Sequence, residues 1–122
     1  MQNQIVSLSV PAEAKYARLV RMTAANLGVL CGLSVDDVED LRMIAEEGFV
    51  YGCSTRPESL EVSFAIAAGV ISSDLPLGDG EVDEGSEDLS LVELLLGAVC
   101  DEFLVTDEGV LHLTKQIGDV HA

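Results

Sequence analysis

Basic residues are scarce in this sequence, whereas acidic residues are abundant. The 122 residues include 6 Lys and Arg against 22 Asp and Glu, which gives a net charge of −16 at pH 7. Such a surface repels phosphate backbones and anionic lipids, so we expect direct binding neither to nucleic acid nor to a membrane. The charge either steers in a partner protein with a basic patch or only keeps a small protein soluble.

Aromatic residues, cysteine pairs and long apolar runs are also lacking. Tryptophan is absent and aromatics make up 4% of the residues, so the core has to be mainly aliphatic. Cys31, Cys53 and Cys100 form no CxxC pair, and we interpret them as small buried residues of a cytoplasmic protein. No segment reaches the roughly 20 apolar residues that span a bilayer, and the first ten residues predict no signal peptide.

The remaining composition is that of one globular domain, residues 1–122, with 48% hydrophobic and 23% charged residues. Alternating apolar residues predict a strand at 4–12 and hairpins within 59–77 and 101–118, and Pro76 predicts an edge or short strand. Helical patterns occupy 12–32, 34–53 and 89–100. This order predicts an α+β fold, a two-layer sandwich with a mainly antiparallel sheet covered on one face by helices.

The first two helical patterns each place recognisable groups of side chains on one face. At 34–53, Ser34 is the expected N-cap, with Asp37 three residues later. On this helix Glu47 and Tyr51 are stacked one turn apart, while Glu46 is expected to point toward Arg42. At 12–32 we predict a broad apolar stripe, with the basic residues off its centre; the stripe consists of Tyr16, Leu19, Val20, Met22, Leu27 and Leu30.

Short motifs along the chain carry a resemblance to a known family. The first half contains "YARLVRMT", "GLS", "DDVEDLRMIAEE" and "GFVY" in collinear order, and the second half contains "CDEFLVTDEGVLHLTK". Over nearly the whole chain this order resembles the RsbW-type anti-sigma-factor serine kinases of the GHKL, or histidine-kinase-like, ATPase superfamily. The resemblance implies that fold, a homodimer, and a protein partner that is a sigma factor or an anti-sigma antagonist. An arginine on the family's first helix contacts these partners, which implies partner binding by Arg18 and Arg21; the alternative is that both are ordinary helix-surface cations.

The resemblance also implies roles for two residues of the second helix. Glu47 stands where the family has the general base that takes a proton from a serine hydroxyl. Tyr51 stands where the family has the asparagine that holds ATP-bound magnesium, and a phenol is a poor ligand for that ion. We therefore expect Glu47 to be a vestigial base, although the spacing alone fits a solvated helix flank equally well.

The family's nucleotide motifs are altered at each matching position. Asp79-Gly80 lacks the spacing of the adenine-binding Asp-x-Gly-x-Gly loop, and Asp83-Glu84-Gly85 comes too late. Ser90 begins the segment that replaces a Gly-x-Gly, whose backbone amides would approach phosphates. The ATP lid, around residues 78–89, is shortened. We predict a degenerate nucleotide site without effective ATP binding, at Tyr51, Asp79, Gly80, Asp83, Gly85 and Ser90.

Three hypotheses for the function remain open. The first is a regulatory protein-binding module that resembles an anti-sigma factor and has no cofactor. The second is an active ATP-dependent protein-serine kinase and anti-sigma factor that uses ATP and magnesium to phosphorylate an antagonist protein. The third is a scaffold domain of unrelated role. No metal site is expected, because neither His112 nor His121 lies in a ligand pattern and the acidic stretch 79–88 lacks EF-hand spacing.

Overall fold

The computed structural model of the chain describes residues 4–67, 69–80 and 87–117. It confirms the predicted order of strands and helices. The elements are β1 (Gln4–Pro11), a 3-10 turn (Ala14–Tyr16), α1 (Ala17–Leu30), α2 (Val35–Ser54), β2 (Ser59–Ala67), β3 (Val70–Pro76), α3 (Glu87–Val99), β4 (Glu102–Val105) and β5 (Val110–Gln116).

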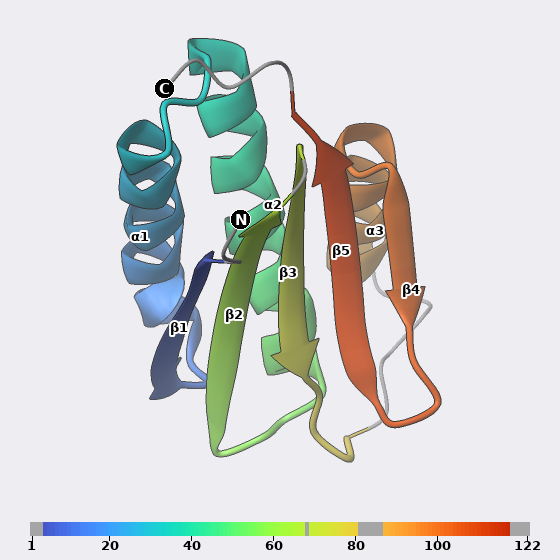
Figure 1. Cartoon of the computed structure of the whole chain (residues 1–122). Coiled ribbons are helices and arrows are strands. Elements are labelled where there is room, and N and C mark those ends of the chain that lie inside the picture. Colours follow the sequence, from blue (N-terminus) through green and yellow to red (C-terminus); the bar gives the residue numbers. More distant parts are fainter. Residues whose placement is uncertain (1–3, 68, 81–86, 118–122) are drawn as a thin grey trace.

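The strands form one five-stranded sheet in the order β1-β2-β3-β5-β4, and every neighbouring pair is antiparallel. Helices α1, α2 and α3 all lie on the same side of this sheet (Figure 1). The predicted α+β two-layer sandwich, with a sheet covered on one face, is therefore confirmed.

The position of β3 corrects one prediction. Pro76 suggested an edge or short strand, but β3 lies between β2 and β5 in the middle of the sheet. Pro76 is the last residue of the strand and stands opposite Val110. Because the missing N–H falls at the end of the ladder, the proline does not interrupt the pairing.

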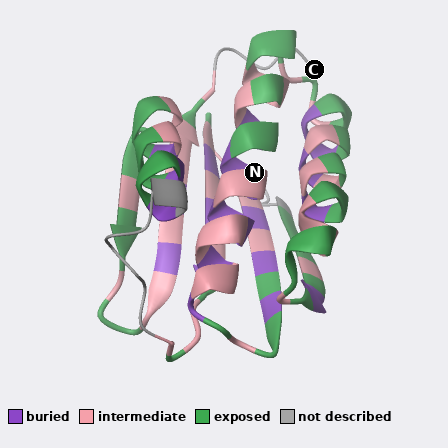
Figure 2. Cartoon of the chain, turned by 180° about the vertical axis from the view of Figure 1, so that it is seen from behind, coloured by how far each residue is buried: buried purple, intermediate pink, exposed green. Residues whose placement is uncertain are grey.

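Helix α2 lies at the centre of the core. Leu41, Ile44 and Phe49 are at most 2% exposed and belong to the hydrophobic core. Figure 2 shows buried residues on the inner sides of helices and strands. A Cβ at Gly48 would lie 2.9 Å from Leu113 Cδ1, and one at Gly52 would lie 2.9 Å from Leu60 Cδ1. These glycines let the helix approach the strands closely.

The N-terminus of α2 is capped as predicted. The Ser34 side chain accepts a hydrogen bond from the Asp37 N–H at 3.1 Å. This bond satisfies one of the backbone donors that a first helical turn leaves without a partner.

The predicted apolar stripe on α1 is only half correct: Val20 and Leu27 are buried and Tyr16 packs against the core, but the other three residues are exposed. Leu19 and Met22 are each 49% exposed and Leu30 is 83% exposed. The buried positions include Ala24 and Gly28, and a Cβ at Gly28 would lie 3.1 Å from Val38 Cγ2 of α2. Small residues let α1 pack closely on α2, so the larger apolar side chains next to them face outward.

The cysteines are half-buried rather than fully buried, and none forms a disulfide. Burial, together with the neighbouring Asp101 charge, raises the pKa of Cys100 to about 11. Within the described part of the chain, no helix combines the length and the apolar character needed to cross a membrane.

Candidate functional site

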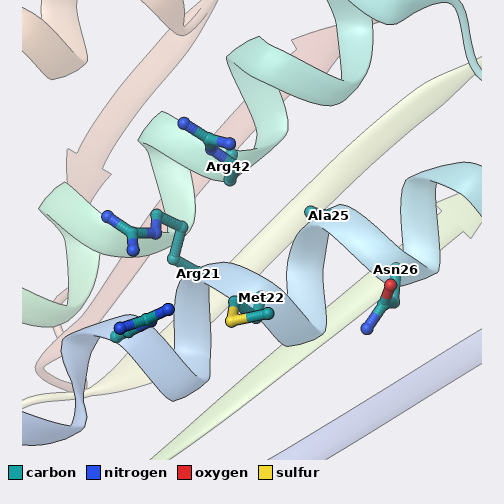
Figure 3. Close-up of a pocket in the computed structure, with 6 residues that line it drawn as sticks. Arg21, Met22, Ala25, Asn26 and Arg42 are labelled. Atoms are coloured by element: carbon teal, nitrogen blue, oxygen red, sulfur yellow. The ribbon is translucent and has the colours of Figure 1, made fainter.

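An open groove of about 280 Å³ lies between α1 and α2 (Figure 3). Three arginines line it, which is half of the 6 basic residues in the chain. The sequence predicted a binding role for Arg18 and Arg21 but missed Arg42. The full lining is Arg18, Arg21, Met22, Ala25, Asn26 and Arg42.

Helical spacing explains how the groove forms. Arg18 and Met22 are four residues apart on α1, and Arg21 follows Arg18 by three, so these side chains share one face of the helix. Arg42 comes from the facing side of α2. A signal for Arg42 existed in the rarity of basic residues, but its contact with α1 depends on tertiary packing.

Two of the three arginines are paired with glutamates of α2. Arg21 Nη1 donates to Glu46 Oε2 at 3.3 Å, and both side chains are about 30% exposed. Arg42 Nη2 lies 3.5 Å from Glu39 Oε2. Glu46 was expected to point toward Arg42; it contacts Arg21 instead, because α1 brings that guanidinium against its flank of α2.

The groove still offers donors to an incoming ligand. Arg18 forms no ion pair with a carboxylate of the described residues, and each guanidinium carries five N–H donors in a planar fork. Met22, half-exposed on the same face, adds apolar surface. This combination suits carboxylate side chains on the surface of another protein.

The other flank of α2 carries Glu47 and Tyr51. Glu47 is half-buried, and burial raises its pKa, with a further rise from the neighbouring Glu46 charge. Tyr51, one turn later, packs edge-on against Phe103 of β4, with ring centroids 6.0 Å apart and planes at 88°. Glu47 is thus more enclosed than a solvated flank residue, and the ring of Tyr51 is part of the packing between α2 and β4.

The segment after β3 packs against the end of α2. Gly78 N–H donates to Thr55 Oγ1 at 2.7 Å, and Gly80 N–H donates to the Thr55 carbonyl at 2.8 Å. A Cβ at Gly78 would lie 2.4 Å from that carbonyl oxygen, and one at Gly80 would lie 2.6 Å from it. Both amides are therefore used inside the chain.

The other predicted nucleotide positions are exposed or lie outside the described residues. Asp79 is exposed, and Ser90 is exposed on α3. Asp83 and Gly85 lie outside the described residues, as does half of the shortened lid around 78–89. Of the six predicted positions, the structure therefore describes Tyr51, Asp79, Gly80 and Ser90, and it places Gly80 beside the C-terminal end of the helix that carries Tyr51.

A histidine between two carboxylates was missed by sequence reasoning. On the face of the sheet that the helices leave open, His112 Nδ1 contacts the Asp74 carboxylate and His112 Nε2 lies 3.6 Å from Glu102 Oε1. Asp74 and His112 are direct partners in the β3–β5 register, so only the pairing of strands could have identified the contact. Among the described side chains, no group of three or more His, Cys, Asp or Glu is arranged to hold a metal ion.

Comparison with known proteins gives a structural match. No family model and no curated protein matches the sequence. The crystal structure of the RsbU and RsbW domains of Rv1364c from Mycobacterium tuberculosis matches with a TM-score of 0.68 and 18% sequence identity. This chain has an RsbW-like fold.

The match covers 93% of this chain but 32% of the other, so this chain spans about a third of the length of the structure it resembles. At 18% identity the likeness concerns the fold alone.

Proposed function

We propose that this chain is a regulatory protein-binding module of the anti-sigma-factor type, without effective ATP binding. The observation that carries the proposal is the groove in which Arg18, Arg21 and Arg42 meet. In a chain of net charge −16, half of the basic residues are gathered at one place. Such a local cationic surface favours complementary pairing with an acidic surface of a partner.

The partner is a sigma factor or an anti-sigma antagonist protein, in keeping with the RsbW-like fold and the family motifs. We also expect a homodimer, and an interface at or beside α1, because this helix supplies Arg18, Arg21 and the exposed side chains of Leu19 and Met22. A module of this kind acts in the cytoplasm on other proteins.

Three features support the proposal that the chain does not bind nucleotide effectively. Tyr51, at the position of the magnesium-binding asparagine, packs on Phe103. The amides of Gly78 and Gly80 are hydrogen-bonded to Thr55. A serine side chain, Ser90, stands where the family has a glycine whose amide approaches phosphate.

Calorimetric titration with purified sigma factors and antagonist proteins tests the binding role. We expect one of them to bind, and expect Arg18→Glu with Arg21→Glu to weaken that binding at least tenfold, or about 1.4 kcal/mol. Binding should also weaken as salt rises, because the attraction between exposed charges is screened.

Lys15→Glu is the matched control. Lys15 is exposed, lies outside the groove, and pairs only loosely with Glu13 at 3.9 Å. It should leave the affinity within about twofold. Binding to none of these proteins, or equal losses in the control and the groove variants, would favour the scaffold hypothesis.

An active protein-serine kinase is the second candidate, and the raised pKa of Glu47 favours it. A general base works best when its pKa lies near the working pH, and burial moves this carboxyl in that direction. Thermal unfolding with Mg-ATP separates the candidates. A ligand at a hundred times its dissociation constant stabilises a fold by about 2.7 kcal/mol.

We expect no shift of the melting temperature with Mg-ATP. An upward shift of several degrees, together with phosphate transfer to an antagonist protein that Glu47→Ala abolishes, would establish the kinase instead.

A further inference from the structure

The groove between α1 and α2 gathers positive charge without an acid in its lining. Helix α1 supplies five of the lining residues and α2 supplies Arg42 (Figure 3). None of these six described residues is acidic, although the chain has 22 Asp and Glu. The groove is therefore a local site for an anion on a molecule whose net charge of −16 otherwise repels anions.

The guanidinium groups of the groove keep hydrogen-bond donors for a ligand. Arg21 Nη1 donates to Glu46 Oε2 at 3.3 Å, and Arg42 Nη2 lies 3.5 Å from Glu39 Oε2. Each guanidinium has five N–H donors, so one such contact holds the side chain in place and leaves the other donors for a ligand. Arg18 forms no ion pair with the described residues.

Guanidinium groups that reach one groove from two helices suit an anion that accepts hydrogen bonds in several directions. A carboxylate has two oxygens in one plane, and a single guanidinium fork satisfies it. A phosphorylated side chain has three terminal oxygens and nearly two negative charges at pH 7. It can accept from two or three forks at once, and clusters of arginine are a recurrent means of recognising such groups in proteins.

The size of the groove and the charge of the chain select the class of phosphate compound. The groove has about 280 Å³, below the roughly 300–1,000 Å³ of pockets that enclose drug-sized ligands. One phosphorylated side chain fits this volume better than a whole nucleotide does. A nucleic acid would place its further phosphates over a strongly acidic molecule, which repels them.

The other lining residues supply contacts for a polypeptide beside the phosphate. Met22 is half-exposed and, together with Ala25, offers apolar surface to neighbouring side chains of a ligand. Asn26 is exposed, and its amide can both donate to and accept from a peptide backbone. These contacts favour a phosphorylated protein segment over a free phosphate ion.

We propose that this groove binds a phosphorylated serine or threonine of a partner protein, with the phosphate held by Arg18, Arg21 and Arg42. The inference rests on the protein-binding groove of the proposed function and names the group that the groove recognises. Phosphorylation of the partner creates the ligand and so controls the association. No phosphoryl group is transferred, so neither Glu47 nor a nucleotide takes part.

Nuclear magnetic resonance titration of the isotope-labelled full chain tests the proposal. The probe is a capped alanine peptide with one central phosphoserine, and the same peptide with serine or glutamate at that place serves for comparison. We expect the phosphopeptide to bind at least tenfold more tightly than the glutamate peptide, with the largest shifts at residues 18–26 and at Arg42. Equal affinities, or no shifts at millimolar phosphopeptide, would overturn the proposal.

Sodium phosphate alone separates a protein ligand from a free anion. We expect inorganic phosphate to bind several-fold more weakly than the phosphopeptide, because it lacks the contacts with Met22 and Asn26. Equal binding of the two probes would identify a site for small anions and contradict the recognition of a protein.

Variants of Arg18 locate the binding and separate the guanidinium fork from its charge. Arg18 is exposed, so its variants should keep the fold. Arg18→Gln should weaken phosphopeptide binding at least tenfold, and Arg18→Lys, which keeps the charge but not the planar fork, should recover only part of that loss. Full recovery by Arg18→Lys would contradict recognition of the phosphate by the fork.

Arg56→Gln is the matched control. It makes the same change of side chain at an exposed arginine beyond the C-terminal end of α2, outside the groove. It should change the dissociation constant of the phosphopeptide less than twofold. Equal losses in Arg18→Gln and Arg56→Gln would mean that overall charge, rather than the groove, binds the phosphate.

The pH dependence of binding gives an independent readout. The second pKa of phosphoserine is about 6, so the probe loses one of its two charges as the pH falls from about 7.5 to about 5.5. Phosphopeptide binding should weaken several-fold over this range, whereas binding of the glutamate peptide should not. Loss of charge on Glu46 or Glu39, which contact the guanidinium groups of the groove, would act in the opposite direction. The same response for both peptides would contradict the proposal.

The two proposals fail in different measurements. A sigma factor or antagonist protein that binds with the same affinity whether phosphorylated or not would retain the proposed function and contradict the phosphate site. Phosphopeptide binding by a chain that binds none of those proteins would retain the phosphate site and contradict the proposed partners.

Discussion

Two adjacent glutamates of helix α2, Glu46 and Glu47, have opposite electrostatic surroundings on the two flanks of the helix. On the α1 flank, Glu46 accepts a hydrogen bond from Arg21 at 3.3 Å, so its charge is balanced. On the Tyr51 flank, formed by Glu47, Tyr51 and Phe103, the carboxyl of Glu47 is partly desolvated and its pKa is raised. A helix turns by about 100° per residue, so neighbours in sequence meet different surroundings.

The contrast bears on which flank can still act on other molecules. The α1 flank keeps guanidinium donors at an open groove, where a partner can reach them. On the Tyr51 flank, by contrast, the Tyr51 ring packs against Phe103 of β4. We infer that function has concentrated on the α1 flank, and that the Glu46-Glu47 pair is not a single functional unit.

The largest effect should follow from Gly78→Ala, at the end of the Tyr51 flank. The new Cβ would lie 2.4 Å from the Thr55 carbonyl oxygen and 2.7 Å from Pro57 N without any ligand present. The glycine is therefore required by the packing of the chain itself, whether or not nucleotide binds. We expect the free energy of unfolding in urea to fall by about 3 kcal/mol, the upper range for overpacking.

Gly97→Ala is the control for that variant. A Cβ at Gly97 has nothing within 4 Å, and the residue lies inside α3. Replacing glycine inside a helix should stabilise the fold by about 0.5–1 kcal/mol. Unchanged stability in Gly78→Ala would mean that the glycine is not needed for packing and would revive a nucleotide role.

Tyr51→Asn should have the second-largest effect. It restores the family's magnesium ligand but removes the ring that packs on Phe103, and the side chain is half-buried. We expect a loss of about 2 kcal/mol, less than full burial of an aromatic would give. No Mg-ATP shift should appear, because the amides of Gly78 and Gly80 remain bonded to Thr55.

Two controls sharpen this comparison. Tyr51→Phe keeps the edge-on ring and should retain most of the stability. On the α1 flank, Arg42→Asn should change stability by less than about 0.5 kcal/mol, since that side chain is 44% exposed. Equal losses for Tyr51→Asn and Arg42→Asn would mean that the two flanks are packed alike.

The sequence predicted those parts of the molecule that depend on local signals. Ser34 and Asp37 are close in the chain, so the cap of α2 could be identified. The hairpin of β2 and β3 could be recognised from alternation. Strand order could not, because pairing of β3 with β5 is a long-range event, and Pro76 then gave a false indication of an edge.

The candidate site was only partly predictable for the same reason. Arg18 and Arg21 lie on one helix face, which spacing shows. Arg42 joins these two arginines, and Glu46 gains its contact with Arg21, only when α1 packs on α2. Three of the six residues in the predicted stripe on α1 are exposed, because apolar residues surround that helix. Small residues such as Gly28, rather than the largest ones, define the face that approaches α2.

The smallest effect should come from Glu47→Gln, and its dependence on pH decides the comparison of the two flanks. A carboxyl whose pKa is raised in the folded state above 4.5 binds its proton more tightly there than in the unfolded chain. Its stabilising contribution is complete below pH 4.5 and is lost as the pH rises through the raised pKa. The amide of glutamine does not titrate and escapes that loss.

The melting temperatures of variant and wild type should therefore agree near pH 4, and the variant should melt slightly higher at pH 7, since the residue is only half-buried. A variant that melts lower than the wild type at pH 7 would mean that Glu47 has a stabilising cationic or hydrogen-bonding partner like that of Glu46, and the two flanks would then not differ in the way proposed.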